Sequence, residues 1–258
     1  MALLETENLT KRFGGITAVD GVDLEVESGE VVGLIGPNGA GKTTMFDCLT
    51  GFQQPTEGRV RFDGQDVTDD SPATRARHGM VRTFQLTREL TTMTVKENMQ
   101  VAVQDHPGDN FWRAIRQGPE VQAFEDEVEA TADRLLKEAS IEHMAETYAG
   151  NLSGGQRKLL SVARAMMVEP DLFLLDEPFA GVSGENRKRI IDYVTGLNEQ
   201  GKTFVVIEHS LGDLMELVDR MVVLNEGRIL ADATPKEVVE NDAVISAYMG
   251  EPLEESTR

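Results

Sequence analysis

The stretch GLIGPNGAGKTTMFDCL, residues 33–49, decides the fold of this chain. The apolar residues around its start, 31–35, form a short run that is typical of a buried strand. Its last residues, 45–49, contain neither Gly nor Pro and can continue as a helix. The sequence therefore predicts a strand, a glycine-rich turn and a helix in direct succession.

The glycine-rich turn has the spacing of a phosphate-binding loop, with Gly36, four further residues, and then Gly41, Lys42 and Thr43. Glycines lack the Cβ atom that would keep backbone N–H groups from converging on an anion. Lys42 can reach the β- and γ-phosphates of a nucleotide, and the Thr43 hydroxyl can bind Mg²⁺. We therefore expect a nucleoside triphosphate to be bound by Gly36, Pro37, Asn38, Gly39, Ala40, Gly41, Lys42, Thr43 and Thr44. The spacing alone leaves open a turn that binds no ligand.

A second group of candidate residues ends the apolar run in LFLLDEP, residues 172–178. Asp176 and Glu177 come at the carboxyl end of this expected strand, and ligands bind at that edge of open α/β sheets. One of these carboxylates can hold Mg²⁺ through water, and the adjacent one can orient and deprotonate an attacking water. Adjacent acids at a strand end also occur by chance, so the pair alone leaves open a site without this role.

A third group lies in NLSGGQRKLL, residues 151–160. Ser153, Gly154 and Gly155 precede an expected helix, so hydroxyl and backbone N–H donors converge at its positive end. The chain thus contains two phosphate-binding devices, although one monomer with one nucleotide has no evident need for the second.

The composition limits the partners of the chain. The formal net charge is −20 over 258 residues, and a field of that sign disfavours nucleic acid as a partner. Two explanations stay open, a solvated acidic surface that favours solubility and adaptation to a cytoplasm with very high salt. The single cysteine, Cys48, suits a reducing compartment, and no apolar run is long enough to cross a bilayer.

The order of the expected elements predicts an α/β fold. Short strands and turns fill the first third, and GRVRFDGQDV, residues 58–67, is typical of a hairpin that turns at Asp63 and Gly64. Residues 90–149 are mainly helical in pattern, and strands alternate with helices from residue 155 onward. We expect a P-loop NTPase core with a mostly parallel sheet, an N-terminal antiparallel β subdomain and an inserted α-helical subdomain.

The glycine loop, LSGGQ and LFLLDEP occur in the order and spacing of an ATP-binding cassette, and the chain resembles the ATPase subunits of ABC transporters over about residues 3–250. The resemblance implies one ABC ATPase domain, 1–250, followed by a tail, 251–258. Within the domain it implies a nucleotide-binding core, 1–87 and 161–250, and a helical subdomain, 88–160, that carries LSGGQ.

The resemblance also explains the second phosphate-binding device. In this family two cassettes pack head to tail, and each ATP lies between the glycine loop of one subunit and the LSGGQ of the other. Ser153, Gly154, Gly155 and Gln156 would then bind the nucleotide of a second ATPase subunit, which is either identical or different.

Further roles are carried over from the family residue by residue. Phe13 in KRFGG matches the aromatic residue that stacks on adenine, although its pattern alone equally suits a strand core. Gln85 in RTFQ matches the glutamine that senses Mg²⁺ and the attacking water, and His209 matches the histidine that contacts the γ-phosphate. The implied catalytic residues are Lys42, Gln85, Glu177 and His209, and the implied magnesium ligands are Thr43, Gln85 and Asp176. Ser183 stands where many cassettes have Asp, which leaves open how the two ATP sites are coupled.

Several segments resemble the ATPases of branched-chain amino acid importers, among them RTFQLTRELTTMTVKENM, residues 82–99, and DEPFAGV, residues 176–182. This resemblance implies ATP and Mg²⁺, transmembrane permease subunits, an indirect link to an extracytoplasmic solute-binding protein, and a peripheral position on the cytoplasmic face of the membrane. Two alternatives stay open. Cassettes that extract lipopolysaccharide share DEPFAGV, and some ABC ATPases act in translation or DNA repair without a membrane partner.

Overall fold

The structure is a computed structural model that describes residues 2–83, 90–103, 119–209 and 211–249. Packing divides the chain into two compact units, which are described one at a time. The first unit contains Met1–Arg82, Asp171–Pro178 and Thr195–Arg258, and the second contains Thr83–Pro170 and Phe179–Val194.

The first unit begins with an antiparallel sheet in the order β2-β1-β4-β5. Its strands are β1 (Ala2–Phe13), β2 (Ile16–Glu27), β4 (Glu57–Phe62) and β5 (Gln65–Asp66). The expected hairpin is confirmed, because Phe62 pairs with Gln65 across Asp63 and Gly64. Both turn residues have positive φ, 47° and 72°, as the tight turn favoured between twisted strands requires.

The second sheet of this unit is mostly parallel, in the order β10-β9-β3-β8-β7-β6. Its strands are β3 (Val31–Ile35), β6 (Met80–Thr83), β7 (Leu172–Asp176), β8 (Thr203–Ile207), β9 (Arg220–Asn225) and β10 (Arg228–Ala233). Every residue of β3, β7 and β8 is buried, which agrees with their continuous apolar runs. β3, β7, β8 and β9 run parallel, and β10 is antiparallel to β9. The predicted fold class is confirmed.

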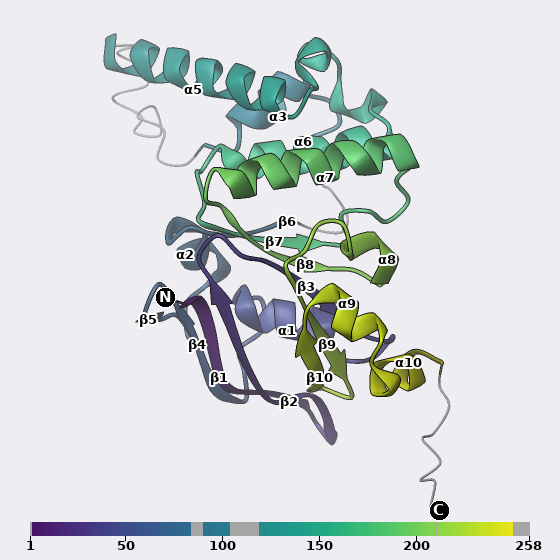
Figure 1. Cartoon of the computed structure of the whole chain (residues 1–258). Coiled ribbons are helices and arrows are strands. Elements are labelled where there is room, and N and C mark those ends of the chain that lie inside the picture. The colour runs from purple at the N-terminus through teal and green to yellow at the C-terminus, as the bar shows by residue number, and fades with distance from the viewer. Residues whose placement is uncertain (1, 84–89, 104–118, 210, 250–258) are drawn as a thin grey trace, which may run out of the picture. The chain divides into compact units, whose positions relative to one another are not determined.

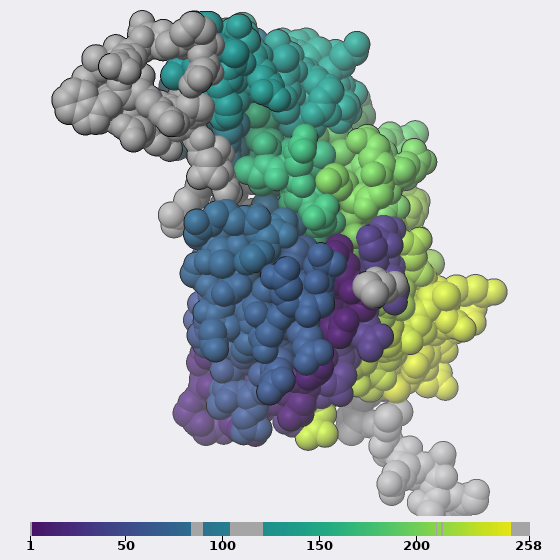
Figure 2. Space-filling model, turned by 90° about the vertical axis from the view of Figure 1, so that its left-hand side faces the viewer, coloured from purple at the N-terminus to yellow at the C-terminus, as the bar shows by residue number. Residues whose placement is uncertain are grey.

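Helix α1 (Lys42–Leu49) lies between these two sheets, and its buried side chains join theirs in one core (Figure 1). The other helices of this unit are α2 (Pro72–Arg77), α8 (Leu211–Leu214), α9 (Pro235–Val239) and α10 (Asp242–Met249). In the space-filling view the purple N-terminal strands lie beside both the blue residues that follow α1 and the yellow C-terminal residues (Figure 2). Segments from both ends of the sequence therefore build this unit.

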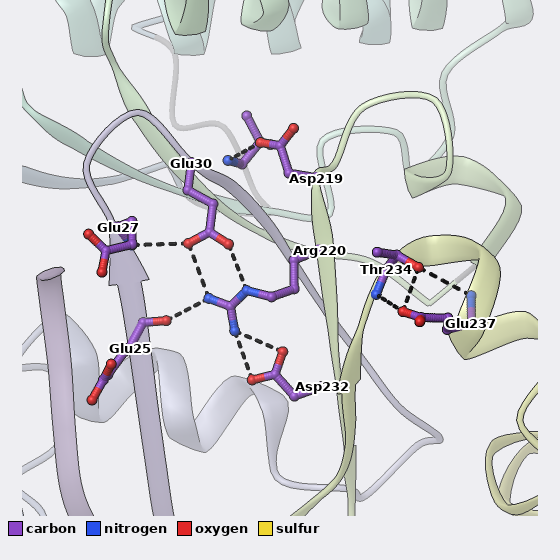
Figure 3. A network of polar contacts seen from close by, with 9 residues as sticks. Glu25, Glu27, Glu30, Asp219, Arg220, Asp232, Thr234 and Glu237 are labelled. Carbon is purple, nitrogen blue, oxygen red and sulfur yellow. Dashed lines mark hydrogen bonds and ion pairs between the residues drawn. The ribbon is translucent and has the colours of Figure 1, made fainter. Parts of the chain in front are cut away.

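An arginine network ties the two sheets together (Figure 3). Arg220 of β9 donates to Glu30 Oε1 at 2.6 Å, to both oxygens of Asp232 at 2.8 and 2.7 Å, and to the Glu25 carbonyl at 2.6 Å. The hydrogen bond to Glu30 is the main cause that raises the pKa of Arg220 above its usual value. The guanidinium thus joins β2, β9 and β10 through fixed charge-assisted bonds.

The second unit is helical. Its helices are α3 (Val95–Gln100), α5 (Pro119–Glu138), α6 (Gly154–Met166) and the first part of α7 (Gly184–Glu199), with short 3₁₀ turns at Glu142–Met144 and Ala149–Asn151. Ala132, Leu135 and Leu136 form the buried apolar face of α5. This unit extends beyond 88–160, the expected helical subdomain, because α6 continues to Met166 and α7 packs against it. No helix in the described ranges is both long and apolar enough to span a bilayer.

Candidate functional site

A pocket of about 240 Å³ opens in the first unit at the carboxyl edge of the parallel strands. It is lined by Ala18, Asn38, Gly39, Ala40, Gly41, Lys42, Thr43, Thr44, Glu177, Ile207 and His209. The structure therefore brings most of the predicted phosphate loop together with Glu177 and His209, which follow the ends of β7 and β8. Parallel strands place their carboxyl ends at one edge, and this explains the meeting of residues so far apart in sequence.

The phosphate loop leads into α1 through Gly41, which has φ 103° and ψ 0° and caps the helix without a side-chain hydrogen bond. The backbone N–H groups of a first helical turn have no acceptor within their own helix. Together with the helix dipole they favour an anion at this point. A Cβ atom on Gly41 would lie 2.2 Å from the Ala18 carbonyl oxygen, so only glycine fits the close approach of the loop to β2.

Lys42 is folded back over this loop. Its side chain is buried, and Nζ donates to the carbonyls of Gly36 at 2.7 Å and Pro37 at 3.1 Å. Burial lowers the pKa of Lys42, and the nearby Glu177 carboxylate partly opposes this shift. The ammonium is therefore held by its own loop, where phosphate oxygens can replace neutral carbonyl acceptors.

Glu177 and His209 lie in direct contact in the pocket. His209 Nε2 lies 2.6 Å from Glu177 Oε1. The Glu177 N–H donates to the Ile207 carbonyl at 3.0 Å, which continues the pairing of β7 with β8. Glu177 also has a φ of 48°, a left-handed conformation that costs an L-residue free energy and is common at functional sites. The chain thus fixes a carboxylate beside an imidazole, a pair that can accept and hold a proton.

Asp176 ends β7 and is buried, with Oδ2 accepting from Arg82 at 2.7 Å. Its carboxylate and the Thr43 hydroxyl are hard oxygen donors of the kind that Mg²⁺ prefers when it also binds phosphates and water. The donor set therefore fits a nucleotide-bound magnesium ion. Gln85, the third expected magnesium ligand, lies outside the described residues.

Phe13 is the last residue of β1 and keeps 47% of its surface exposed. Its ring lies under Lys11 Nζ, which is 5.1 Å from the ring centroid. The alternative of a buried strand residue is wrong, because the exposed ring has a face available for stacking. Its contact with adenine stays a prediction.

The predicted second phosphate device belongs to the helical unit. Ser153 caps α6 by accepting from the Gln156 N–H at 3.4 Å, and the Gln156 Oε1 accepts from the Ser153 N–H at 2.8 Å. A Cβ atom on Gly155 would lie 2.4 Å from the Cβ atom of Asn186, so this glycine is needed for the packing of α6 against α7. A Cβ atom on Gly154 would meet nothing closer than 3.8 Å, so packing within the chain does not require that glycine.

The sequence analysis did not identify Arg82 and Asp47, which lie next to Asp176 in the structure. Arg82 of β6 bonds Asp176 and also donates to Asp47 of α1 at 2.6 Å. A signal for Arg82 was present in the sequence, since this arginine lies in a short strand at the start of RTFQ. An arginine that is buried in a strand needs anionic partners. Its partners are not predictable from spacing, since they lie 35 and 94 residues away.

Comparisons with known proteins agree with this geometry. The family model described as ABC transporter matches residues 19–180, and the model described as branched-chain amino acid ATP-binding cassette transporter matches residues 228–254. The chain is 42% identical over 250 residues to the high-affinity branched-chain amino acid transport ATP-binding protein BraF of Pseudomonas aeruginosa, covering 96% of this chain and 98% of that protein. It is 38% identical to the high-affinity branched-chain amino acid transport ATP-binding protein LivG of Escherichia coli K12, with the same coverage.

Solved structures match at the level of the whole fold. A nucleotide-free ATP-binding cassette from an ABC transporter superposes with a TM-score of 0.85 at 37% identity, covering 97% of this chain and 100% of that one. A dimeric cassette in a post-hydrolysis state, bound to ADP and Pi, has a TM-score of 0.72 at 27% identity and covers 90% of this chain and 98% of that one.

Proposed function

This chain belongs to the ABC transporter family, as one of its ATPase subunits, and we propose that it drives the uptake of branched-chain or other amino acids. The observation that carries the proposal is similarity along almost the entire chain to branched-chain amino acid transport ATP-binding proteins. The separate match of residues 228–254 to a model of that subfamily supports the same cargo class.

In the proposed reaction the loop N–H groups hold the phosphates of ATP, and Phe13 stacks on the adenine. Lys42 exchanges the carbonyls of Gly36 and Pro37 for phosphate oxygens, which are stronger acceptors for an ammonium. Thr43, Asp176 and Gln85 would hold Mg²⁺, which neutralises phosphate charge when bound.

Glu177 is the proposed general base. A water oxygen forms a bond to the γ-phosphorus, the bond from that phosphorus to the β–γ bridging oxygen breaks, and Glu177 takes the proton of the water. His209, 2.6 Å from Glu177, fixes the carboxylate and contacts the γ-phosphate. The products are ADP and inorganic phosphate.

We propose that two cassettes form a dimer around two ATP molecules. Ser153, Gly154, Gly155 and Gln156 at the start of α6 would bind the γ-phosphate held by a second ATPase subunit. The lack of any close neighbour within 3.8 Å of a Cβ position at Gly154 supports this role, because packing within the chain does not explain a glycine there. The dimeric state of the similar cassette bound to ADP and Pi is a further support.

The chain would act at the cytoplasmic face of the membrane through transmembrane permease subunits. Closure of the dimer would pull on permeases that dock near Gln85 and the helical unit, and hydrolysis would reopen it. An extracytoplasmic solute-binding protein would deliver the amino acid to the same permeases.

The test is affinity purification of tagged Glu177→Gln protein with ATP from detergent-solubilised host membranes, followed by mass spectrometry. Without the base, ATP should stay bound and keep the complex closed. We expect multi-helix permeases and a second short cassette, which should be lost in the matched Glu177→Gln, Lys42→Ala double variant. The companion binding protein should then bind leucine, isoleucine or valine. Recovery of ribosomal proteins, or of lipid-extraction partners, would overturn the amino acid assignment.

A further inference from the structure

Arg82 of β6 lies between two carboxylates of the first unit. Its side chain is 8% exposed, with one nitrogen 2.6 Å from Asp47 Oδ1 and another 2.7 Å from Asp176 Oδ2. Its guanidinium carbon lies 5.7 Å from the ring centroid of Phe46 and 5.8 Å from that of Phe52. Two carboxylates and two aromatic rings therefore surround the guanidinium and restrict its orientation.

The two carboxylates belong to the elements that carry the phosphate and magnesium residues. Asp47 lies on α1, the helix that starts at Lys42 and Thr43, and Asp176 ends β7. The terminal torsion of an aspartate is broad and roughly two-fold, so an unsupported carboxylate samples several orientations. The bond from Arg82 engages Oδ2 of Asp176, and this restricts the orientation of the whole carboxylate.

We propose that Arg82 is a positioning residue that holds Asp176 ready for nucleotide-bound magnesium, and that Asp47 in turn holds Arg82. The proposal rests on the proposed function, because it assigns a support to the magnesium carboxylate of that site. Two carboxylates and one guanidinium leave one net negative charge, so the arrangement still attracts a cation. Arginine suits the task because its planar fork serves both carboxylates at once, whereas an ammonium is a single point charge.

The test measures ATP affinity in the Glu177→Gln background, so that no turnover occurs. For each variant, the dissociation constant of ATP in EDTA is divided by the constant in Mg²⁺, which gives the affinity gained from the metal. We expect Arg82→Gln to lower this ratio about tenfold or more, the range typical when a support of a metal ligand is lost. Affinity in EDTA should change less than about twofold, because Arg82 does not line the nucleotide pocket.

Two further variants keep the test valid if Arg82→Gln folds poorly. Asp47→Asn keeps the size of the side chain and the bond between Arg82 and Asp176, and it should lower the ratio several-fold. Arg82→Lys should give an intermediate ratio. Mn²⁺ in place of Mg²⁺ gives a second readout, because the electron paramagnetic resonance spectrum of bound Mn²⁺–ATP should broaden in the same order of variants.

Arg220→Gln is the matched control. Arg220 also joins two carboxylates, Glu30 and Asp232, but lies outside the nucleotide pocket (Figure 3). It should lower the melting temperature and leave the ratio unchanged. An unchanged ratio in Arg82→Gln would make that arginine structural only, and a raised ratio would show that it competes with the metal; either result overturns the inference. A parent protein with no metal-dependent gain would instead contradict the proposed function.

Discussion

The starts of α1 and α6 both follow glycine-containing motifs, yet the structure builds them differently. α1 is capped by Gly41 in a left-handed conformation, with no side-chain hydrogen bond to its first turn. α6 is capped by Ser153 in an extended conformation, and Ser153 and Gln156 close a capping box. The first helix leaves its N–H donors for a ligand, whereas the second satisfies two donors with its own side chains.

Capping boxes also start α3 and α9, through Thr94 with Glu97 and Thr234 with Glu237. A side-chain cap stabilises a helix by about 1 kcal/mol. α1 gives up that stabilisation and keeps an anion site, which is the usual cost of a pre-formed binding site.

The largest effect should come from Lys42→Ala at the start of α1. ATP affinity should fall about a hundredfold or more, since a charge-assisted contact to phosphate is lost. The melting temperature should stay equal or rise, because burial already disfavours the ammonium and lowers its pKa. Calorimetric titration with ATP and thermal unfolding measure both, with Lys236→Ala, an exposed lysine of α9, as the control. Unchanged ATP binding in Lys42→Ala would contradict the interpretation of the start of α1 as a phosphate-binding site.

Comparison of Gly41→Ala with Gly39→Ala should separate two costs of replacing a glycine in the same loop. One cost is the strain of a positive φ angle, and the other is a steric clash of the new Cβ atom. Both glycines have positive φ, but a Cβ atom on Gly39 would meet nothing within 4 Å. Backbone strain alone should cost about 1–2 kcal/mol at Gly39, and the clash with the Ala18 carbonyl should raise the cost at Gly41 to about 3 kcal/mol or more. Urea unfolding of both variants measures the difference, and equal costs would contradict the close approach of the loop to β2.

Comparison of Gly155→Ala with Gly154→Ala should separate packing within the chain from dimerisation at the start of α6. The contact with Asn186 should destabilise Gly155→Ala by about 1–3 kcal/mol, as overpacking does. Gly154→Ala should be neutral in stability, yet it should weaken ATP-dependent dimerisation measured by light scattering in the Glu177→Gln background. Asn186→Gly should restore the stability of Gly155→Ala, and a failure of this rescue would show that the crowding has another source.

A smaller loss of stability than that of Gly155→Ala should come from Ser153→Ala, which removes the cap and should cost about 1 kcal/mol of unfolding free energy. Ser153→Asp should retain the cap and the stability, but it places a negative charge where the partner's γ-phosphate is proposed to bind. We expect it to abolish ATP-dependent dimerisation. Normal dimerisation of Ser153→Asp would contradict the proposal that the partner's γ-phosphate binds next to Ser153.

Local patterns predicted the parts of the site that depend on neighbours in the sequence. The phosphate loop and the carboxylates at the end of β7 follow from short motifs, whereas His209 after β8 was implied by the family resemblance. Parallel strands bring their carboxyl ends to one edge. The Phe13–adenine contact, the role of Gln85 and the effect of Ser183 stay predictions. They depend on a ligand, an undescribed segment or a second subunit.

Arg75 illustrates what the sequence did not indicate. It is fully buried on α2, and its guanidinium donates to the carbonyls of Cys48 at 2.6 Å, Leu49 at 2.5 Å and Thr68 at 2.8 Å. Burial lowers its pKa, although the negative end of α1 receives its charge. Nothing in the local sequence distinguishes this arginine from the exposed Arg77 on the same helix.

The sequence by itself determined the strand, loop and helix order, the phosphate loop and the pair Asp176 and Glu177, because these rest on backbone preferences and on periodic burial within a few residues. Only the tertiary structure decided that Arg82 joins Asp47 to Asp176. Only the tertiary structure also shows that Gly155 must be small because it packs against Asn186 of α7, whereas Gly154 has no such close contact. Such roles arise from close packing between distant segments, where the space and charge at a residue are set by partners that its own sequence neighbourhood does not contain.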